Sequence, residues 1–430
     1  MHLIRRGWRW LLANRDRWIF LVLGLAFAIR AAVLVRYRLS LTLNSDDVGY
    51  MHSAIWLLQY GRFTYHAPDE PTAHMMPGIT LLLAAVFAVF GWGPWGVMIA
   101  KGVMTLFGVA AVYGVYLCGR EAFGVFAGLI AALGAAIYVP GVLTDTLLLT
   151  EPPFAAAFAF LMYFTLRLVR TRQTRDLLAA VGCYLVALYF RPTVALFPLV
   201  ILIYLLSHRY PWRKLVRHAG LGAVVVCLLL APWWVRNEVT FHRFVPLTNG
   251  QGDPLLLGTF QGEGFPPGTY QDTLNAIKAA HPGVDAFHLS TLEKQAAEQR
   301  LKTWWREDRS AFLRSFLSIK PQILWNRPFY WKPILRVKQD TMRWVQPILI
   351  QLGCIGWAVA LILGRRRRET LFFILTLVYY TALYAAYFAY GRYSEPFMPY
   401  LFLGVGAGLA AVAHTAWRLY RAALRRRFNG

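Results

Sequence analysis

Residues 44–83 read NSDDVGYMHSAIWLLQYGRFTYHAPDEPTAHMMPGITLLL, a polar and acidic stretch between apolar segments. Asn44 or Ser45 can cap a helix whose first turn carries Asp46 and Asp47. Apolar residues then recur at helical spacing until Gly61, a residue that commonly ends a helix. The pattern predicts a short amphipathic helix that lies along a membrane surface, with two carboxylates at its N-terminus.

These two carboxylates have a chemical and a structural interpretation. The exposed N–H groups and the dipole at a helix start favour negative charge. Two neighbouring carboxylates also repel each other, so one of them can take up a proton near neutral pH and act as a general base. The alternative is that both acids only cap a surface helix, which is the commoner role of an isolated acidic pair.

The composition indicates a membrane protein. Hydrophobic residues make up 57% of the 430 positions, and apolar runs near the length of a membrane span recur along the chain. The net charge of +24 comes from basic residues that gather in short runs beside apolar segments. This distribution is typical of cytoplasmic loops and of contact with anionic membrane lipids, and it argues against nucleic-acid binding. The basic runs are 5–17, 167–175, 209–217, 365–368 and 418–427.

The alternation of apolar segments and basic runs predicts an all-α polytopic bundle of about ten crossings. Segment 77–90 is short for a span, and the parity of the crossings makes it a re-entrant or interfacial helix on the outer side. We therefore expect a transmembrane catalytic module at 1–235 with an outer acidic loop at 44–76, an outer loop region at 236–344, and C-terminal transmembrane helices with a basic tail at 345–430. Within the outer region, a capping box at Ser290 and Glu293 predicts a helix start.

Charged residues on the predicted outer face suit group transfer from a lipid-carried anion. A carboxylate would take a hydroxyl proton, while arginines would hold a phosphate leaving group by charge-assisted hydrogen bonds. Arg30 lies inside an apolar segment, so it needs a partner or an anionic ligand, unless it snorkels to the headgroups. The outer-side cations nearest to the acidic helix are Arg30, Arg191, Arg236 and Arg392.

A divalent metal ion is a further interpretation of the outer loop. His66 and His74, with neighbouring acids, could hold such an ion, but their spacing fits no tight ligand motif. Whether a metal takes part is therefore open at this stage.

Several short motifs follow the acidic pair in a fixed order. Tyr50, Gly61, residues 71–74 and Pro77-Gly78 come first. The later motifs are Gly119-Arg120 before Phe123-Gly124, Glu151-Pro152, Arg191-Pro192-Thr193, Ala231-Pro232-Trp233 with Arg236-Asn237, Pro246-Leu247 with Asn249-Gly250, and Arg392-Tyr393 with Pro396 and Pro399. This order resembles that of GT-C-fold glycosyltransferases, in particular the bacterial relatives of protein O-mannosyltransferases and of lipid A aminoarabinose transferase. The resemblance covers essentially the whole chain.

The resemblance implies an inverting transfer, with or without a metal ion, from a polyprenyl-phosphate sugar to an acceptor hydroxyl outside the membrane. Asp46 matches the first acid of the family's pair and would be the base. Asp47 takes the second place, where relatives often have Glu, so the division of labour between the two is open. Glu151 matches a second acidic site that helps to organise the donor or acceptor pocket. The candidates for the acceptor and sugar pocket are Tyr50, His66, His74 and Asn249.

The expected partners are a polyprenyl-phosphate sugar donor, membrane lipids and an acceptor that is a lipid, a glycan or a protein. The expected location is a bacterial inner membrane, with both termini in the cytoplasm and the active site on the outer face. The competing class is a transporter or flippase for lipid-linked sugars, which would also need charges within the membrane. Transporters tend to show paired halves, and this chain shows no internal repeat. A structural scaffold would leave Arg30, Asp46 and Glu151 unexplained.

Overall fold

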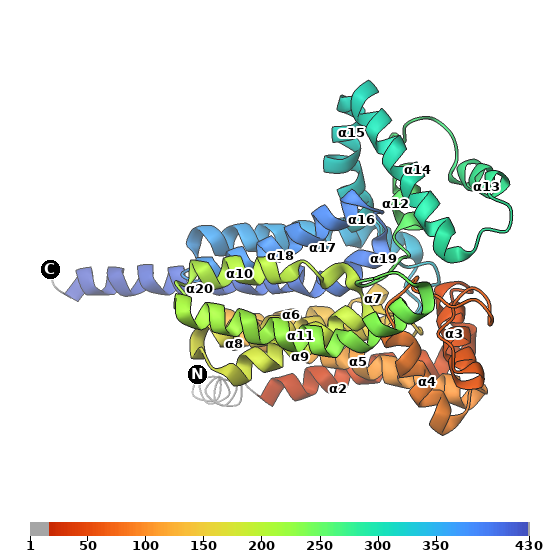
Figure 1. Ribbon diagram of the computed structural model, residues 1–430. Helices are drawn as coiled ribbons and strands as arrows, with labels where there is room; N and C mark the ends of the chain where they lie inside the picture. Colours follow the sequence, from red (N-terminus) through yellow and green to blue (C-terminus); the bar gives the residue numbers. More distant parts are fainter. Residues whose placement is uncertain (1–16, 429–430) are drawn as a thin grey trace.

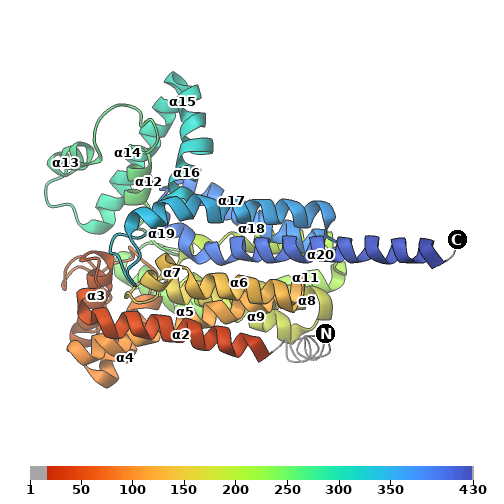
Figure 2. The same ribbon diagram turned by 180° about the vertical axis from the view of Figure 1, so that it is seen from behind.

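The computed structural model describes residues 17–428, which are helical throughout apart from connecting loops and contain no β-strand (Figure 1). The long helices run side by side in a bundle (Figures 1 and 2). They are α2 (Trp18–Tyr37), α5 (Pro94–Ala122), α6 (Val125–Ile137), α8 (Glu151–Thr171), α9 (Thr174–Phe190), α10 (Phe197–Ser207), α11 (Trp212–Phe241), α17 (Gln339–Leu363), α18 (Arg367–Ala386) and α20 (Met398–Phe428). The predicted all-α fold class is confirmed.

The protein is an integral membrane protein. Seven helical segments in residues 17–428 are long and apolar enough to cross a membrane, and three shorter apolar segments accompany them. The shorter ones are α4 (Gly78–Phe90), α6 and Pro192–Ser207, which contains α10. The exact number of crossings stays a prediction.

The bundle has two chemically different ends (Figures 1 and 2). We call one the α3 end, because α3 (Asp46–Tyr60), α4 and α19 (Gly391–Ser394) lie there. The other, the basic end, holds the connections at 123–124, 172–173, 208–211 and 364–366 and the end of α20. The basic runs 167–175, 209–217 and 365–368 therefore share one end of the molecule. Residues 5–16 of the first basic run lie outside the described residues.

Small residues allow the helices of the bundle to approach closely. A Cβ atom added at Gly356 of α17 would lie 2.3 Å from the carbonyl oxygen of Gly404 in α20. A Cβ atom at Gly119 of α5 would lie 2.5 Å from the Cα atom of Gly128 in α6. Lipid is as apolar as leucine, so close backbone packing of this kind is what holds transmembrane helices together.

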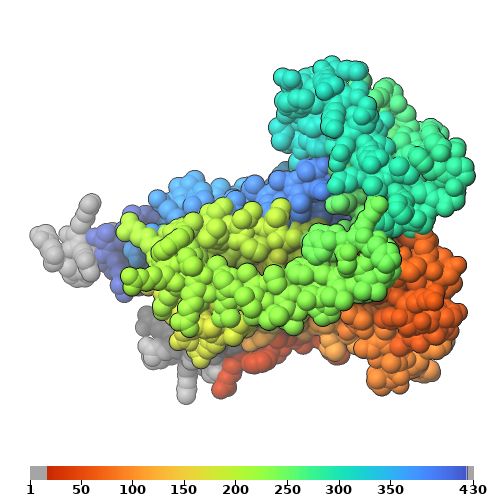
Figure 3. Space-filling view, in the orientation of Figure 1, coloured from red at the N-terminus to blue at the C-terminus, as the bar shows by residue number. Residues whose placement is uncertain are grey.

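The predicted outer region forms a group of helices that rises beside the α3 end (Figure 3). They are α12 (Gly252–Gly258), α13 (Tyr270–Ala280), α14 (Ala286–Glu307), α15 (Arg309–Arg314) and α16 (Lys320–Asn326). Both expected boundaries, after 235 and after 344, fall inside helices, because α11 continues to Phe241 and α17 begins at Gln339. The predicted helix start at Ser290 is wrong: α14 begins at Ala286, where the Asp285 carboxylate accepts from the backbone N–H of His288.

Helix α4 is the segment that we expected to be re-entrant or interfacial. It lies beside α3 at the α3 end in both ribbon views. Ala54 of α3 packs with Ile79 and Leu83 of α4 in a small buried cluster. This contact fixes α3 across the end of the bundle, with its first turn next to α19 and the start of α8.

Candidate active site

Helix α3 begins at Asp46 and ends at Tyr60, with Gly61 in the left-handed region at a φ of 66°. The helix stop is as predicted, but neither Asn44 nor Ser45 caps the start with its side chain. The Asp47 carboxylate reaches back into the preceding loop. It is buried and accepts hydrogen bonds from the Thr42 hydroxyl at 2.6 Å and from the backbone N–H of Leu43 at 2.9 Å. Asp47 thus shapes the loop before the helix.

Asp46 belongs to a chain of four charged side chains. Its carboxylate accepts a hydrogen bond from Nη2 of Arg392 in α19 at 2.5 Å. Nε of Arg392 lies 3.0 Å from the carboxylate of Glu151, which lies 2.5 Å from Nη1 of Arg191. Four separate elements therefore meet: the start of α3, α19, the start of α8 and the turn after α9.

Burial distinguishes the two carboxylates of this chain. The Glu151 side chain is 2% exposed, whereas that of Asp46 is 32% exposed. Glu151 lies between two arginines that would repel each other without it. It therefore holds both guanidinium groups in place, while Asp46 is open to a molecule that enters the site.

Arg191 remains charged although it is buried. Burial by itself would lower its pKa, but the nearby Tyr384 and Glu151 raise that pKa above its ordinary value. Nη2 of Arg191 lies 3.3 Å from the Tyr384 hydroxyl, and Nη1 lies 3.4 Å from the Thr150 hydroxyl. A guanidinium with fixed partners on two sides presents its remaining N–H donors in a fixed direction.

A cavity of about 560 Å³ opens beside this network. Asp46, Arg191 and Arg392 line one part of it. The other part is apolar and aromatic, and one of its lining residues, Leu196, is 60% exposed on the outside of the bundle. The cavity therefore joins a charged site to a surface that faces lipid. Its apolar and aromatic lining residues include Phe190, Ala195, Leu196, Leu383, Tyr387 and Phe388.

An aromatic group from α3 and the following loop closes the cavity near Asp46. The Tyr65 and His74 rings stack at 5.2 Å, and the Tyr50 ring lies 5.9 Å from Tyr65. Burial lowers the pKa of His74 to about 4 and also lowers the pKa of His66. Both imidazoles are therefore neutral at pH 7. Tyr50, Tyr65 and His74 line the cavity, whereas His66 does not; its ring lies 5.0 Å from the Tyr65 ring and 5.1 Å from the His74 ring.

The described side chains do not fit a resident metal ion. Within residues 17–428, no group of three or more His, Cys, Asp or Glu side chains is arranged to share one. The His66 and His74 rings meet edge to face, at an interplanar angle of 74°. We therefore derive no step through a metal.

Two of the predicted phosphate-binding arginines lie outside the cavity. Nε of Arg30 donates to Asp145 at 2.8 Å, and its Nη atoms bond to backbone carbonyls of α2 and α6. Arg236 donates to the carbonyl of Thr72 at 2.6 Å and to that of Phe63 at 2.9 Å. Arg30 thus ties helices together, and Arg236 holds the loop between α3 and α4.

Asn249 likewise donates its hydrogen bonds to backbone carbonyl groups of other segments. Its side-chain amide donates to the carbonyl of Phe287 at 2.7 Å, and its backbone N–H donates to the carbonyl of Ala73 at 2.8 Å. The neighbouring Thr248 and Gly250 line the cavity. Asn249 thus fixes the loop that forms this wall.

Asp253 is a cavity residue that the sequence reasoning missed. It lies in the first turn of α12 and accepts a hydrogen bond from the Tyr270 hydroxyl at 2.7 Å. Its position, four residues after Asn249, was the available signal, because that loop already carried a predicted site residue. Tyr65 and Tyr384 carried no comparable signal.

Comparison with known proteins adds to this geometry. Residues 69–235 match the family model described as dolichyl-phosphate-mannose-protein mannosyltransferase. AglB, an oligosaccharyltransferase from Archaeoglobus fulgidus in complex with an inhibitory peptide and a dolichol-phosphate, matches 96% of this chain and 52% of its own, at 16% identity and a TM-score of 0.56. The protein has the GT-C fold.

Further matches to this GT-C chain are of the same kind. The A. fulgidus oligosaccharyltransferase in complex with Zn and sulfate matches 94% of this chain and 51% of its own, at 15% identity and a TM-score of 0.54. ArnT from Cupriavidus metallidurans bound to undecaprenyl phosphate matches 93% of this chain and 78% of its own, at 16% identity and a TM-score of 0.43. The present chain spans about half the length of the archaeal enzymes. No curated protein matches it in sequence.

Proposed function

We propose that this GT-C protein transfers a sugar from a polyprenyl-phosphate donor to an acceptor hydroxyl in the cavity at the α3 end. The observation that carries the proposal is the meeting of one accessible carboxylate, Asp46, with two buried arginines beside an apolar wall. The phosphate of such a donor needs cationic groups, its lipid chain needs an apolar wall, and the transfer of its sugar needs a base, and these must lie next to one another.

Arg191 and Arg392 are suited to hold the donor phosphate. Nη1 of Arg392 and Nε of Arg191 make no ion pair or hydrogen bond within residues 17–428, so each guanidinium keeps a free donor. Charge-assisted hydrogen bonds from these atoms would stabilise the negative charge that develops on the leaving phosphate. Glu151 acts as a positioning residue, because it holds both arginines without reaching solvent.

Asp46 is suited to act as the base. The acceptor oxygen attacks the anomeric carbon, its proton passes to the Asp46 carboxylate, and the bond from that carbon to the phosphate oxygen breaks with its electron pair on the phosphate. Attack from the side opposite the phosphate inverts the configuration. Asp47 supports this step indirectly, because it fixes the loop that leads into α3.

The lipid nature of the donor is supported by the cavity and by the comparisons. The apolar wall continues to Leu196 on the exposed side of the bundle, where a polyprenyl chain can lie without crossing polar protein. The matched family model is described by a dolichyl-phosphate-linked mannose, and the AglB complex contains a dolichol-phosphate. The acceptor, whether lipid, glycan or protein, would approach past Asp253 and the outer helices.

Sidedness is part of the proposal. The gathering of basic connections at the end opposite the cavity supports a cytoplasmic basic end, and hence an active site on the outer face of a bacterial inner membrane. A cysteine placed beside Arg366 should react with a membrane-impermeant thiol reagent only after the cells are opened. Labelling of this cysteine in intact cells would show that the protein has the opposite orientation.

The test of the function is a comparison of cells with and without the gene by mass spectrometry of envelope lipids and glycans. The expected result is one acceptor that loses a single sugar, with accumulation of the matching polyprenyl-phosphate sugar. A flippase would instead leave the donor trapped and remove several sugar-bearing products together. The purified protein should then transfer the sugar from the accumulated donor in detergent.

A further inference from the structure

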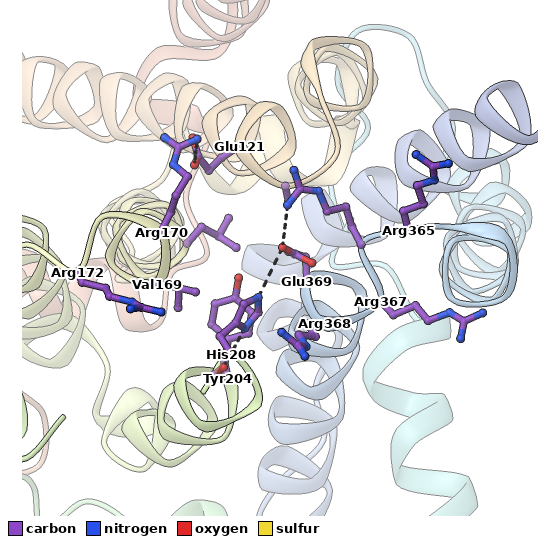
Figure 4. Close-up of a pocket in the computed structure, with 13 residues that line it drawn as sticks. Glu121, Val169, Arg170, Arg172, Tyr204, His208, Arg365, Arg367, Arg368 and Glu369 are labelled. Carbon is purple, nitrogen blue, oxygen red and sulfur yellow. Dashed lines mark hydrogen bonds and ion pairs between the residues drawn. The ribbon is translucent and has the colours of Figure 1, made fainter. Parts of the chain in front are cut away.

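A second cavity, of about 570 Å³, lies at the basic end, on the far side of the bundle from the active site. It is formed by the last turns of α5 and α8, the end of α10 and the start of α18. Figure 4 shows charged side chains from these four helices around one space. The proposed transfer reaction uses none of them.

The charge around this basic pocket is strongly unbalanced. Six arginines line it, against two glutamates. Glu121 pairs with Arg170 at 2.8 Å, and Glu369 lies 3.4 Å from Arg366 and 3.7 Å from His208. The arginines of the pocket that form no ion pair in the described part of the chain are Arg172, Arg365, Arg367 and Arg368. Figure 4 shows Arg172 and Arg368 beside the space and Arg365 and Arg367 directed away from it, so Arg172 and Arg368 offer cationic donors without a carboxylate partner.

A buried hydroxyl points to the same kind of ligand. Tyr204 is 4% exposed, and its ring stacks on Phe372 at 4.2 Å. The hydroxyl makes no hydrogen bond within residues 17–428, yet Tyr204 lines the pocket and Figure 4 shows its oxygen directed into it. The oxygen is open to the pocket, so it can donate to an acceptor from outside the chain.

The start of α18 adds backbone donors. Helix α18 begins at Arg367, and the residue before it, Arg366, makes no side-chain cap. The first N–H groups of a helix have no partner within the helix, and they favour an anion at that position. Arginine side chains, a tyrosine hydroxyl and a helix start thus converge on one hollow.

The rule that cytoplasmic loops are basic explains the number of arginines but not this arrangement. That rule concerns the number of basic residues in a loop, and it is met equally well by side chains on an open surface. Here the Glu121 and Glu369 side chains lie inside the hollow and pair with arginines on its rim. Basic pockets between transmembrane helices on the cytoplasmic side are known sites for phosphate-bearing headgroups.

We propose that the basic pocket binds a phosphate group on the membrane side opposite the active site. The phosphate can belong to an anionic phospholipid or to a soluble phosphate. The proposal does not depend on the transferase function. Arg172 and Arg368 supply charge, and the Tyr204 hydroxyl donates one hydrogen bond.

The test uses the purified full-length protein and native mass spectrometry with added phosphatidylglycerol, and with phosphatidylcholine as the lipid without net charge. Replacement of Arg172 and Arg368 by Gln should weaken phosphatidylglycerol binding about tenfold or more, because two charge-assisted bonds are lost. The matched control is Arg213→Gln with Lys214→Gln, which removes the same charge from an exposed part of the basic end. It should change binding by less than about twofold. Equal losses in the two double variants would overturn the proposal.

A milder variant keeps the test valid if the double variant is unstable. Tyr204→Phe removes only the hydroxyl, so binding should weaken about fivefold while the thermal unfolding temperature stays unchanged. Full binding by Tyr204→Phe would contradict the proposed contact.

Soluble inorganic phosphate separates the two sources. If millimolar phosphate neither binds nor displaces phosphatidylglycerol, a lipid is the ligand. If phosphate binds and the lipid does not, the site serves a soluble anion. If neither binds in a pocket-dependent way, the proposal is wrong.

Discussion

The arginines at the two ends of the bundle are held in different ways. At the α3 end, Arg191 and Arg392 are buried and ion-paired, and Glu151 bridges them. At the basic end, the paired Arg170 and Arg366 side chains are 66% and 65% exposed. Buried ion pairs are geometrically fixed, and removal of one partner strongly destabilises the folded protein. Exposed ion pairs contribute little to the free energy of folding. We therefore expect substitutions at the α3 end to change stability and chemistry, and those at the basic end to change mainly the binding of ions and lipids.

The largest expected effect is on stability at the α3 end. Glu151→Gln leaves two buried guanidinium groups without their shared carboxylate, which should cost about 3–5 kcal/mol of folding free energy. The matched control is Glu121→Gln at the basic end, whose partner Arg170 is exposed and which should cost no more than about 1 kcal/mol. Chemical unfolding in detergent compares the two. If both variants lose the same free energy of unfolding, the proposed difference between the two ends is wrong.

The next effect is a pH dependence that belongs to the α3 end. The pKa of His74 is lowered from 6.5 to about 4 by burial, so the unfolded chain binds more protons than the folded protein between these values. The stability is fully present above pH 6.5 and should fall as the pH drops toward 4, by up to about 3 kcal/mol.

Unfolding curves at pH 7.5 and 5 measure this dependence. His74→Gln should have a shallower loss over the same range, because Gln does not titrate. An unchanged slope in His74→Gln would assign the dependence to other groups.

Substitutions of Arg191 and Arg392 should lower the affinity for the donor, whereas a substitution of Arg236 should not. Arg191→Lys and Arg392→Lys keep the charge but lose the planar fork, so the affinity for a polyprenyl phosphate should fall about tenfold. Arg236→Lys is the control, since Arg236 donates to the Phe63 and Thr72 carbonyls outside the cavity. A loss confined to Arg236→Lys would move the phosphate site away from α19.

The smallest expected effect concerns Asp47. Asp47→Asn keeps the shape but weakens the hydrogen bonds from Thr42 and Leu43, so transfer should fall about fivefold. Donor affinity should not change. A loss as large as that of Asp46→Asn in the same assay would give Asp47 a direct part in the chemistry.

Much of the fold was predictable because apolar length and basic runs are local signals. The start and end of α3 and the helical segments of the bundle follow from residues close together in the sequence. The contacts of the residues before α3, where no side chain caps the helix, were not predictable in this way. Ser45 is a common capping residue, but the Asp47 carboxylate accepts its backbone N–H together with that of Leu43.

The site was predictable only in part, because its geometry depends on distant contacts. Motif order singled out Asp46, Glu151, Arg191 and Arg392, and the structure brings these four together. Sequence alone does not reveal that Arg30 pairs with Asp145, 115 residues away. An outer-face arginine satisfied by carbonyl groups has the same local sequence signature as one that is free to hold a ligand.

The most direct test of the proposed chemistry is the rate of sugar transfer by purified Asp46→Asn with a polyprenyl-phosphate sugar. Asn keeps the shape of the side chain and removes the charge that accepts a proton, so transfer should fall at least about a hundredfold. Donor affinity and the unfolding temperature should stay near those of the unmodified protein. Asp69→Asn, on the exposed loop of the same end, should remain fully active. An Asp46→Asn protein that retains most of its transfer activity would contradict the role of Asp46 as the base.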